Sequence, residues 1–154
     1  MATRSRPAEP TPRTLHVAEP PARFGEPQPA VVDASLIAAL LFAEPEQTAA
    51  AQGLAQCRPV APELLPYELA NVALNKLRRG HAEQAVRASL ARLDALDIEL
   101  HAVAAQLSFE LAARYRLTAY DAAYLALASQ LRCPLLTFDT RLADVARQHL
   151  GAAD

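Results

Sequence analysis

The chain has 154 residues, of which 52% are hydrophobic and 21% are charged, and this size and composition are typical of a single globular domain. Its formal net charge of −2 excludes a protein that binds nucleic acid through overall positive charge, and its two cysteines exclude a disulfide scaffold. The longest apolar run, residues 36–43, is shorter than the roughly 20 residues that span a membrane, so we expect a cytoplasmic protein with no membrane partner.

Residues 1–29 differ in composition from the rest of the chain. They hold seven of the twelve prolines, and their net charge is +1, whereas the remainder carries −3. Proline fixes φ and removes an amide donor, so this density of prolines disfavours both helices and sheet ladders. We therefore predict a disordered or extended tail over 1–29 and one folded domain over 30–154.

From residue 30 onward, short apolar runs alternate with long segments rich in alanine and leucine. In chain order, the pattern predicts a strand at 30–32, helices at 34–43 and 45–57, a strand at 60–61, helices at 63–79 and 82–95, a strand at 98–100, helices at 103–115 and 119–131, a strand at 134–138 and a helix at 140–149. Gly80 is the expected stop signal of the long third helix. Short strands that alternate with helices favour an α/β fold built around a parallel sheet.

Acidic residues stand at the ends of several predicted elements. Asp33 follows the first strand, and Asp139 follows the last. Ligands of open parallel sheets bind beyond the carboxyl ends of the strands, so these two aspartates would converge if their strands are neighbours. Asp121 lies in the first turn of a predicted helix, and Glu68 lies within the long third helix. The four carboxylates are therefore candidates for a single site.

Each of these residues also has an interpretation without catalysis. Asp33 and Asp139 could cap helices, because aspartate accepts hydrogen bonds from the free amides at a helix start. The segment Thr118–Asp121 fits a capping box. Glu68 could belong to a solvated helix face, together with other polar residues at helical spacing. The occurrence of all four in this order favours a shared site over four unrelated caps and surface residues.

Four segments together resemble the PIN-domain ribonucleases. They are Val31–Ser35, Glu68 with Asn71, Tyr120–Ala128 and Leu136–Asp139. The resemblance covers about residues 30–150 and is strongest to the VapC-type toxins of type II toxin–antitoxin pairs. The proline-rich tail departs from the family pattern, since such toxins usually start at or just before the first strand.

The resemblance implies a fold, an activity and a set of residues. The fold is a three-layer α/β structure in which helices flank a parallel sheet, and the activity is metal-dependent endoribonuclease cleavage of RNA by the domain at 30–154. With Mg²⁺ or Mn²⁺ as cofactor, the catalytic and metal-binding residues would be Asp33, Glu68, Asp121 and Asp139. The supporting polar residues would be Ser35, Asn71 and Thr137.

The chemistry of phosphodiester hydrolysis explains why carboxylates are needed. The reaction must activate a water and stabilise negative charge, and a hard divalent cation does both. Mg²⁺ prefers a few carboxylates and keeps several waters, which leaves room for a substrate phosphate. Four nearby carboxylates repel one another, so a bound cation should also stabilise the fold. We expect Asp33 and Asp139 to bind the ion directly, while Glu68 and Asp121 act directly or through waters.

An acidic site must still attract a polyanion, and several basic residues are candidates for contacts with RNA phosphates. They are Lys76, Arg78, Arg79, Arg114, Arg116 and Arg141. The first three stand at the end of the long third helix, where cations are also favoured by the negative pole of the helix without any ligand.

A different class of function is a non-catalytic PIN-like module that acts by binding proteins. The complete set of four acidic residues favours the enzyme. A toxin implies a cognate antitoxin, which would bury an apolar groove near the site. The predicted helices 34–43 and 45–57 are apolar enough to supply such a groove or a homodimer face, unless these faces simply pack on the sheet.

Overall fold

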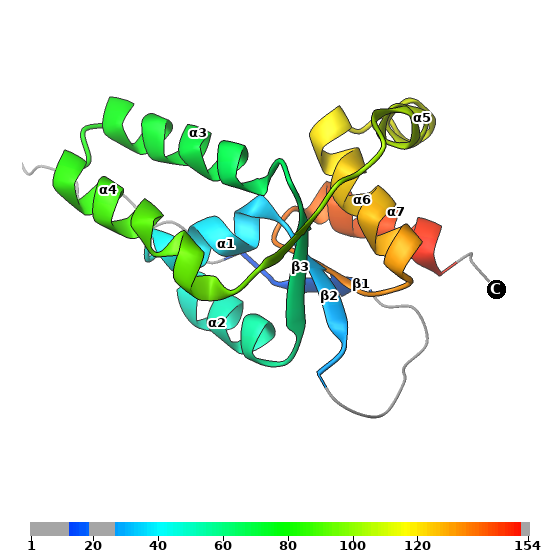
Figure 1. Ribbon diagram of the computed structural model, residues 1–154, viewed down its shortest axis with the longest axis horizontal. Coiled ribbons are helices and arrows are strands. Elements are labelled where there is room, and N and C mark those ends of the chain that lie inside the picture. The colour runs from blue at the N-terminus through cyan, green and yellow to red at the C-terminus, as the bar shows by residue number, and fades with distance from the viewer. Residues whose placement is uncertain (1–12, 19–26, 152–154) are drawn as a thin grey trace, which may run out of the picture.

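The computed structural model describes residues 13–18 and 27–151 and shows one mixed sheet between two layers of helices (Figure 1). The strands are β1 (His16–Ala18), β2 (Pro29–Val32), β3 (Arg58–Pro62), β4 (Glu99–His101) and β5 (Leu135–Thr137). Their order across the sheet is β1-β5-β2-β3-β4, and all neighbours are parallel except β1, which runs antiparallel to β5. The predicted α/β fold is confirmed, with one antiparallel strand added to it.

The central strands explain why two distant aspartates meet. β2 and β5 pair in parallel with Val31 opposite Leu135 and Val32 opposite Leu136. These four side chains are at most 4% exposed, as expected for parallel strands covered by helices on both faces. β2 and β5 therefore end at the same edge of the sheet, and the two helices that follow them begin next to each other.

The helices are α1 (Ala34–Leu41), α2 (Gln47–Ala55), α3 (Leu65–Arg78), α4 (Glu83–Ala91), α5 (Ala105–Tyr115), α6 (Ala119–Leu131) and α7 (Thr140–Leu150), with a short 3₁₀ helix, η1 (Leu93–Leu96). Gly80 follows α3 at a φ of 86°, as its predicted role as a stop signal requires. The single helix predicted at 82–95 is divided into α4 and η1, and Asp97 ends η1 in the left-handed region at a φ of 50°.

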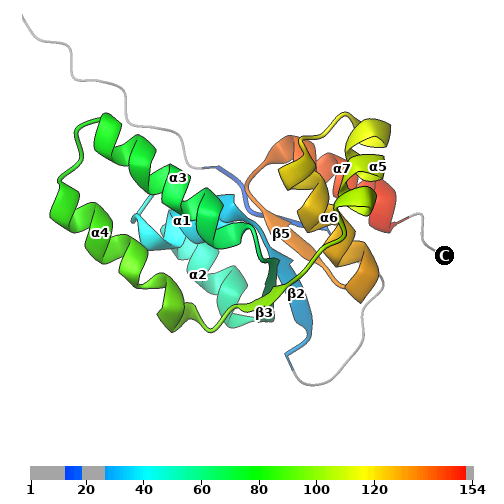
Figure 2. The same ribbon diagram turned by 45° about the horizontal axis from the view of Figure 1, so that its top comes forward.

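The helices form two layers, which Figures 1 and 2 show from two directions. α6 packs on β2 and β3, and α7 packs on β5, with α5 beside α6. α1 and α2 lie on the other face, and α3 and α4 form a hairpin next to them. Every residue from Ala122 to Ala128 in α6 is buried, which is typical of a helix inside the core. Among the described residues, no helix combines the length and apolar character needed to cross a membrane.

The first helix belongs to the core and does not form an open groove. Leu36, Ile37 and Leu41 are at most 1% exposed and join the main hydrophobic cluster. The sequence allows a partner groove, a homodimer face or packing on the sheet for this helix, and its buried side chains show that it packs in the core.

The strand β1 comes from the segment for which the sequence predicts a tail. His16 lies opposite Thr137 and Ala18 opposite Leu135, and Ala18 is fully buried. Leu15 packs closely on α2, because a Cβ atom at Gly53 would lie 2.8 Å from Leu15 Cδ2. The predicted tail therefore contributes a strand to the sheet, while its residues 1–12 and 19–26 lie outside the described part of the chain.

Candidate active site

Asp33 is a buried carboxylate surrounded by hydrogen-bond donors. It is the N-cap of α1, and its Oδ1 accepts from the backbone amide of Leu36 at 3.0 Å. The hydroxyl of Ser35 donates to Oδ1 at 2.7 Å, and the hydroxyl of Thr137 donates to Oδ2 at 2.6 Å. The side chain is only 5% exposed, so the capping interpretation is correct and is compatible with a place in a site.

The ionisation of Asp33 is finely balanced. Burial raises its pKa to about 6, although the hydrogen bonds from Thr137 and Ser35 lower it. The negative charge of Asp139 raises this pKa further. Asp33 therefore titrates near pH 6, and a cation bound next to it would favour its ionised form.

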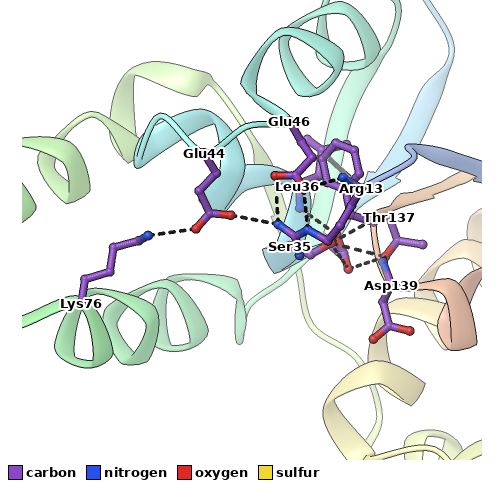
Figure 3. Close-up of polar contacts among 10 residues, drawn as sticks. Arg13, Ser35, Leu36, Glu44, Glu46, Lys76, Thr137 and Asp139 are labelled. Atoms are coloured by element: carbon purple, nitrogen blue, oxygen red, sulfur yellow. Dashed lines mark hydrogen bonds and ion pairs between the residues drawn. The ribbon is translucent and has the colours of Figure 1, made fainter. Parts of the chain in front are cut away.

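Thr137 and Ser35 connect the two strand ends. Thr137 Oγ1 donates to Asp33 and accepts from the backbone amide of Asp139 at 2.9 Å (Figure 3). Ser35 Oγ accepts from the amide of Phe138 at 3.0 Å. Asp139 is itself the N-cap of α7. The start of α1 and the start of α7 are thus fixed to each other, and both aspartates lie at their junction.

Glu68 and Asp121 are held from the helices α3 and α6. The hydroxyl of Tyr124, a side chain that is 1% exposed, donates to Glu68 Oε2. Asp121 is tied to the cap of α6, because its amide donates to Thr118 Oγ1 at 3.0 Å and the Thr118 hydroxyl donates to Asp121 Oδ2 at 2.7 Å. Asp121 and Tyr124 are three residues apart, so they share one side of α6.

Two of the four carboxylates, Asp33 and Glu68, have pKa values that are raised by the charges of other members of the set. Burial raises the pKa of Glu68, the hydrogen bond from Tyr124 lowers it, and the negative charges of Asp121 and Asp33 raise it. Asp139 acts on Asp33 in the same way. The charges of Asp121 and Asp33 therefore act on Glu68, and that of Asp139 acts on Asp33, although the four residues come from separate segments.

The donor set fits a hard divalent cation in its chemistry. Carboxylate oxygens are the ligands that Mg²⁺ and Mn²⁺ prefer, and four of them lie in one negative field. In the described residues, however, no three His, Cys, Asp or Glu side chains are already arranged to hold an ion. Asp33 and Glu68 accept hydrogen bonds from Thr137 and Tyr124, and such bonds are typical of carboxylates that also bind a cation.

The remaining predicted residues lie at different distances from this region. Asn71 is exposed on α3, and its side chain makes no hydrogen bond to another described residue. Lys76 bonds to Glu44 at 2.9 Å and stands eight residues after Glu68, about 12 Å farther along the helix axis. Beyond Lys76, the cations Arg78 and Arg79 are exposed at the end of α3.

The other three predicted cations are on α5, α7 and the turn after α5. The guanidinium of Arg114 lies 5.1 Å from the ring centroid of Tyr115. The side chain of Arg141 donates to the backbone carbonyl of Arg116, so these two arginines are neighbours. Arg141 is the second residue of α7 and Asp139 is its N-cap, which places this pair beside the strand ends.

Two residues of this region were missed by sequence reasoning. Tyr124 lies within the motif of α6, and its spacing of three from Asp121 was the only signal for its role. Arg13 was assigned to the tail. Its Nε donates to Glu46 Oε1 at 2.9 Å and its Nη2 to Glu44 Oε2 at 2.9 Å (Figure 3). No local pattern in the sequence indicates this contact.

Comparison with known proteins places the geometry in a family. Residues 30–148 match the family described as PIN domain. The curated protein Ribonuclease VapC3 of Pyrobaculum aerophilum is 34% identical over 120 residues, which is 74% of this chain and 92% of that protein. The crystal structure of PAE2754 from the same organism has the same fold, with a TM-score of 0.62 and 21% identity over 81% of this chain and 90% of that one. The family match begins after β1.

Proposed function

This chain belongs to the PIN-domain family, and from that premise we propose that it is a divalent-metal-dependent endoribonuclease and the toxin of a toxin–antitoxin pair. The supporting observation is that Asp33 and Asp139, at the ends of two neighbouring parallel strands, are joined through the hydroxyl of Thr137, while the charges of Asp121 and Asp33 act on Glu68. The reaction class agrees with the name of the curated relative, a ribonuclease.

In this proposal the acidic residues hold Mg²⁺ or Mn²⁺. Asp33 and Asp139 would bind it directly, and Glu68 and Asp121 would bind it directly or through waters. When bound, such a cation supplies Lewis acidity toward a phosphoryl oxygen and lowers the pKa of its water. These roles require ionised carboxylates, and the hydrogen bonds from Thr137 and Ser35 favour the ionised form of Asp33.

The surrounding side chains give each carboxylate a separate task. Asp33 is enclosed and fixed by hydroxyl donors, which suits a residue that must keep one orientation. Glu68 is half-buried, its pKa is raised by burial, and Tyr124 holds one of its oxygens in place. We assign to Glu68, the less enclosed of the two, the role of accepting the proton from the attacking water.

We expect the RNA and the protein partners to bind around this site. We assign phosphate contacts first to the neighbours Arg116 and Arg141, because they lie beside the strand ends. An antitoxin and a second copy of the chain are the proposed protein partners, and cellular RNA makes the cytoplasm the place of action. Large exposed apolar side chains on α3, α5 and α6 support a protein interface; they are Tyr67, Leu74, Phe109 and Tyr120.

The test of the enzymatic proposal is cleavage of an unstructured, fluorescently labelled oligoribonucleotide by the full chain. We expect cleavage with Mg²⁺ or Mn²⁺, none with EDTA, and none by Asp33→Asn. The matched control is Asp144→Asn, because Asp144 is an exposed carboxylate on α7 that pairs only with Arg147 among the described residues. It should cleave as the wild type does. Intact RNA under all conditions, or full activity of Asp33→Asn, would favour the protein-binding module instead.

A further inference from the structure

We propose that Arg13 positions the RNA substrate by binding a backbone phosphate beside the acidic site. This inference rests on the proposed ribonuclease function. Arg13 precedes the region that matches the PIN domain, which begins at residue 30, so the match to the family does not include it. It is not among the cations that the sequence suggested for RNA binding.

The strand β1 carries Arg13 to the site. Because His16 pairs with Thr137 in antiparallel register, residues 13–15 run alongside the chain that leads from β5 into α7. Leu15 and Ala18 anchor this segment in the core. The guanidinium of Arg13 lies 5.5 Å from the ring centroid of Phe138, the residue directly before Asp139.

Two carboxylates hold the guanidinium in a defined orientation. Glu46 has a side chain that is only 4% exposed, and it accepts from both the backbone amide of Arg13, at 2.6 Å, and its Nε, at 2.9 Å. A buried carboxylate needs such a partner, since an unpaired buried charge is strongly destabilising. The Arg13 hydrogen bond accordingly keeps the pKa of Glu46 low. An arginine fixed in this way loses little side-chain conformational entropy when it binds a further group.

The guanidinium keeps capacity for a further ligand. The Arg13 side chain is 45% exposed, and its Nη1 makes no hydrogen bond to another described residue. Glu44, which bonds Nη2, also bonds Lys76 through its other oxygen. A phosphate can therefore replace Glu44 at Arg13 without leaving that carboxylate unpaired. The planar fork of arginine suits two phosphate oxygens.

Arg13 is also close to the reacting region. The hydrogen bond with Glu46 raises the pKa of Arg13, and the nearby charges of Glu44 and Asp33 raise it as well. Lys76, in contrast, is 16% exposed and lies about 12 Å along α3 from Glu68. A polyanion that approaches four carboxylates needs a cation near the point of contact, and Arg13 supplies it.

Steady-state cleavage of the same oligoribonucleotide tests this role over a range of salt concentrations. Arg13→Ala should raise KM by about fivefold to tenfold, leave kcat within about twofold, and reduce the slope of log(kcat/KM) against log[salt] by about one. Arg13→Lys keeps the charge without the fork and should give an intermediate KM. Arg87→Ala is the control, because Arg87 pairs with Glu83 on the exposed face of α4.

Three outcomes would overturn the proposal. A lowered unfolding midpoint with unchanged KM and salt slope, in both Arg13 variants, would make Arg13 a structural clamp only. A higher kcat/KM in Arg13→Ala would mean that the segment covers the site. An equal change in Arg87→Ala would mean a general charge effect. If the wild type does not cleave RNA at all, the proposed ribonuclease function is wrong. Fluorescence anisotropy of the uncut RNA with wild type and with Arg13→Ala would then still test whether Arg13 binds RNA.

Discussion

The strand ends and the helices hold their halves of the candidate site by different kinds of contact. In the strand half, Asp33 and Asp139 share the hydroxyl of Thr137, and the register of β2 and β5 sets their separation. In the helix half, Glu68 is joined to α6 by the single hydroxyl of Tyr124. One half is therefore fixed by the sheet, and the other depends on one contact between two helices.

This difference has a consequence for stability. Asp33 and Thr137 in the strand half are buried, although Asp139 is exposed, so the loss of a hydrogen bond between those two leaves an unsatisfied polar group inside the protein. Glu68 is only half-buried, and water can replace a lost partner. Removal of the buried Thr137 hydroxyl in the strand half should therefore lower both stability and cleavage, whereas substitutions in the helix half should affect mainly cleavage.

The largest effect is expected for Asp33→Asn. Cleavage should fall by at least about 100-fold. The loss of a residue that only supports a metal ligand costs about 10-fold to 100-fold, and the loss of a ligand itself should cost more. The unfolding midpoint at neutral pH should stay the same or rise, since a buried charge is removed. Cleavage rates and thermal unfolding of Asp33→Asn and Asp121→Asn measure the comparison. A smaller loss of cleavage in Asp33→Asn than in Asp121→Asn would contradict the expected order of the two halves.

The next effect is a dependence on pH that arises from the strand half. The pKa of Asp33 is raised to about 6 in the folded protein, above its ordinary value of about 3.9 in an unfolded chain. Its contribution to stability is therefore present at low pH and is lost as the pH rises through about 6. Cleavage should change in the opposite direction and fall about tenfold per pH unit below 6.

The measurement is the free energy of unfolding from about pH 4 to 8, together with kcat/KM over the same range, because the change should fall between about pH 4 and pH 6. Asp33→Asn should remove this part of the stability profile. A stability curve of the same shape in wild type and variant would show that Asp33 does not titrate there.

A smaller effect is expected for Thr137→Val. The substitution keeps the shape of the side chain but leaves Asp33 Oδ2 and the amide of Asp139 without this hydroxyl, which should cost about 1–3 kcal/mol of stability. Urea unfolding gives this number, and Thr140→Val, at the first position of α7, is the control. Equal stability of Thr137→Val and wild type would contradict the role assigned to the hydroxyl.

The smallest effect is expected for Tyr124→Phe. The loss of one hydroxyl that contacts a half-buried carboxylate should cost about 0.5–1.5 kcal/mol and reduce cleavage a few-fold. Urea unfolding and cleavage assays of Tyr124→Phe and Thr137→Val under the same conditions show which substitution has the larger effect. If Tyr124→Phe is the less stable of the two, the helix half is the more tightly built.

The parts of the fold that depend on local patterns were predictable. The apolar runs gave β2 and β5, and the aspartates after them were recognised both as caps and as candidates for a site. The parts that depend on distant contacts were not. Tyr124 and Glu68 are 56 positions apart, and Arg13 and Glu46 are 33 apart, so no periodicity connects them. The strand His16–Ala18 is too short to be recognised without its partner β5.

The strand β1 also determines how the sheet meets other molecules. It pairs along the outer side of β5, whose three residues are at most 4% exposed. Without β1, an apolar strand would present open amides and carbonyls, the kind of edge that recruits strands from other chains. A chain shortened beyond residue 18 should therefore self-associate at concentrations at which the full chain stays dispersed.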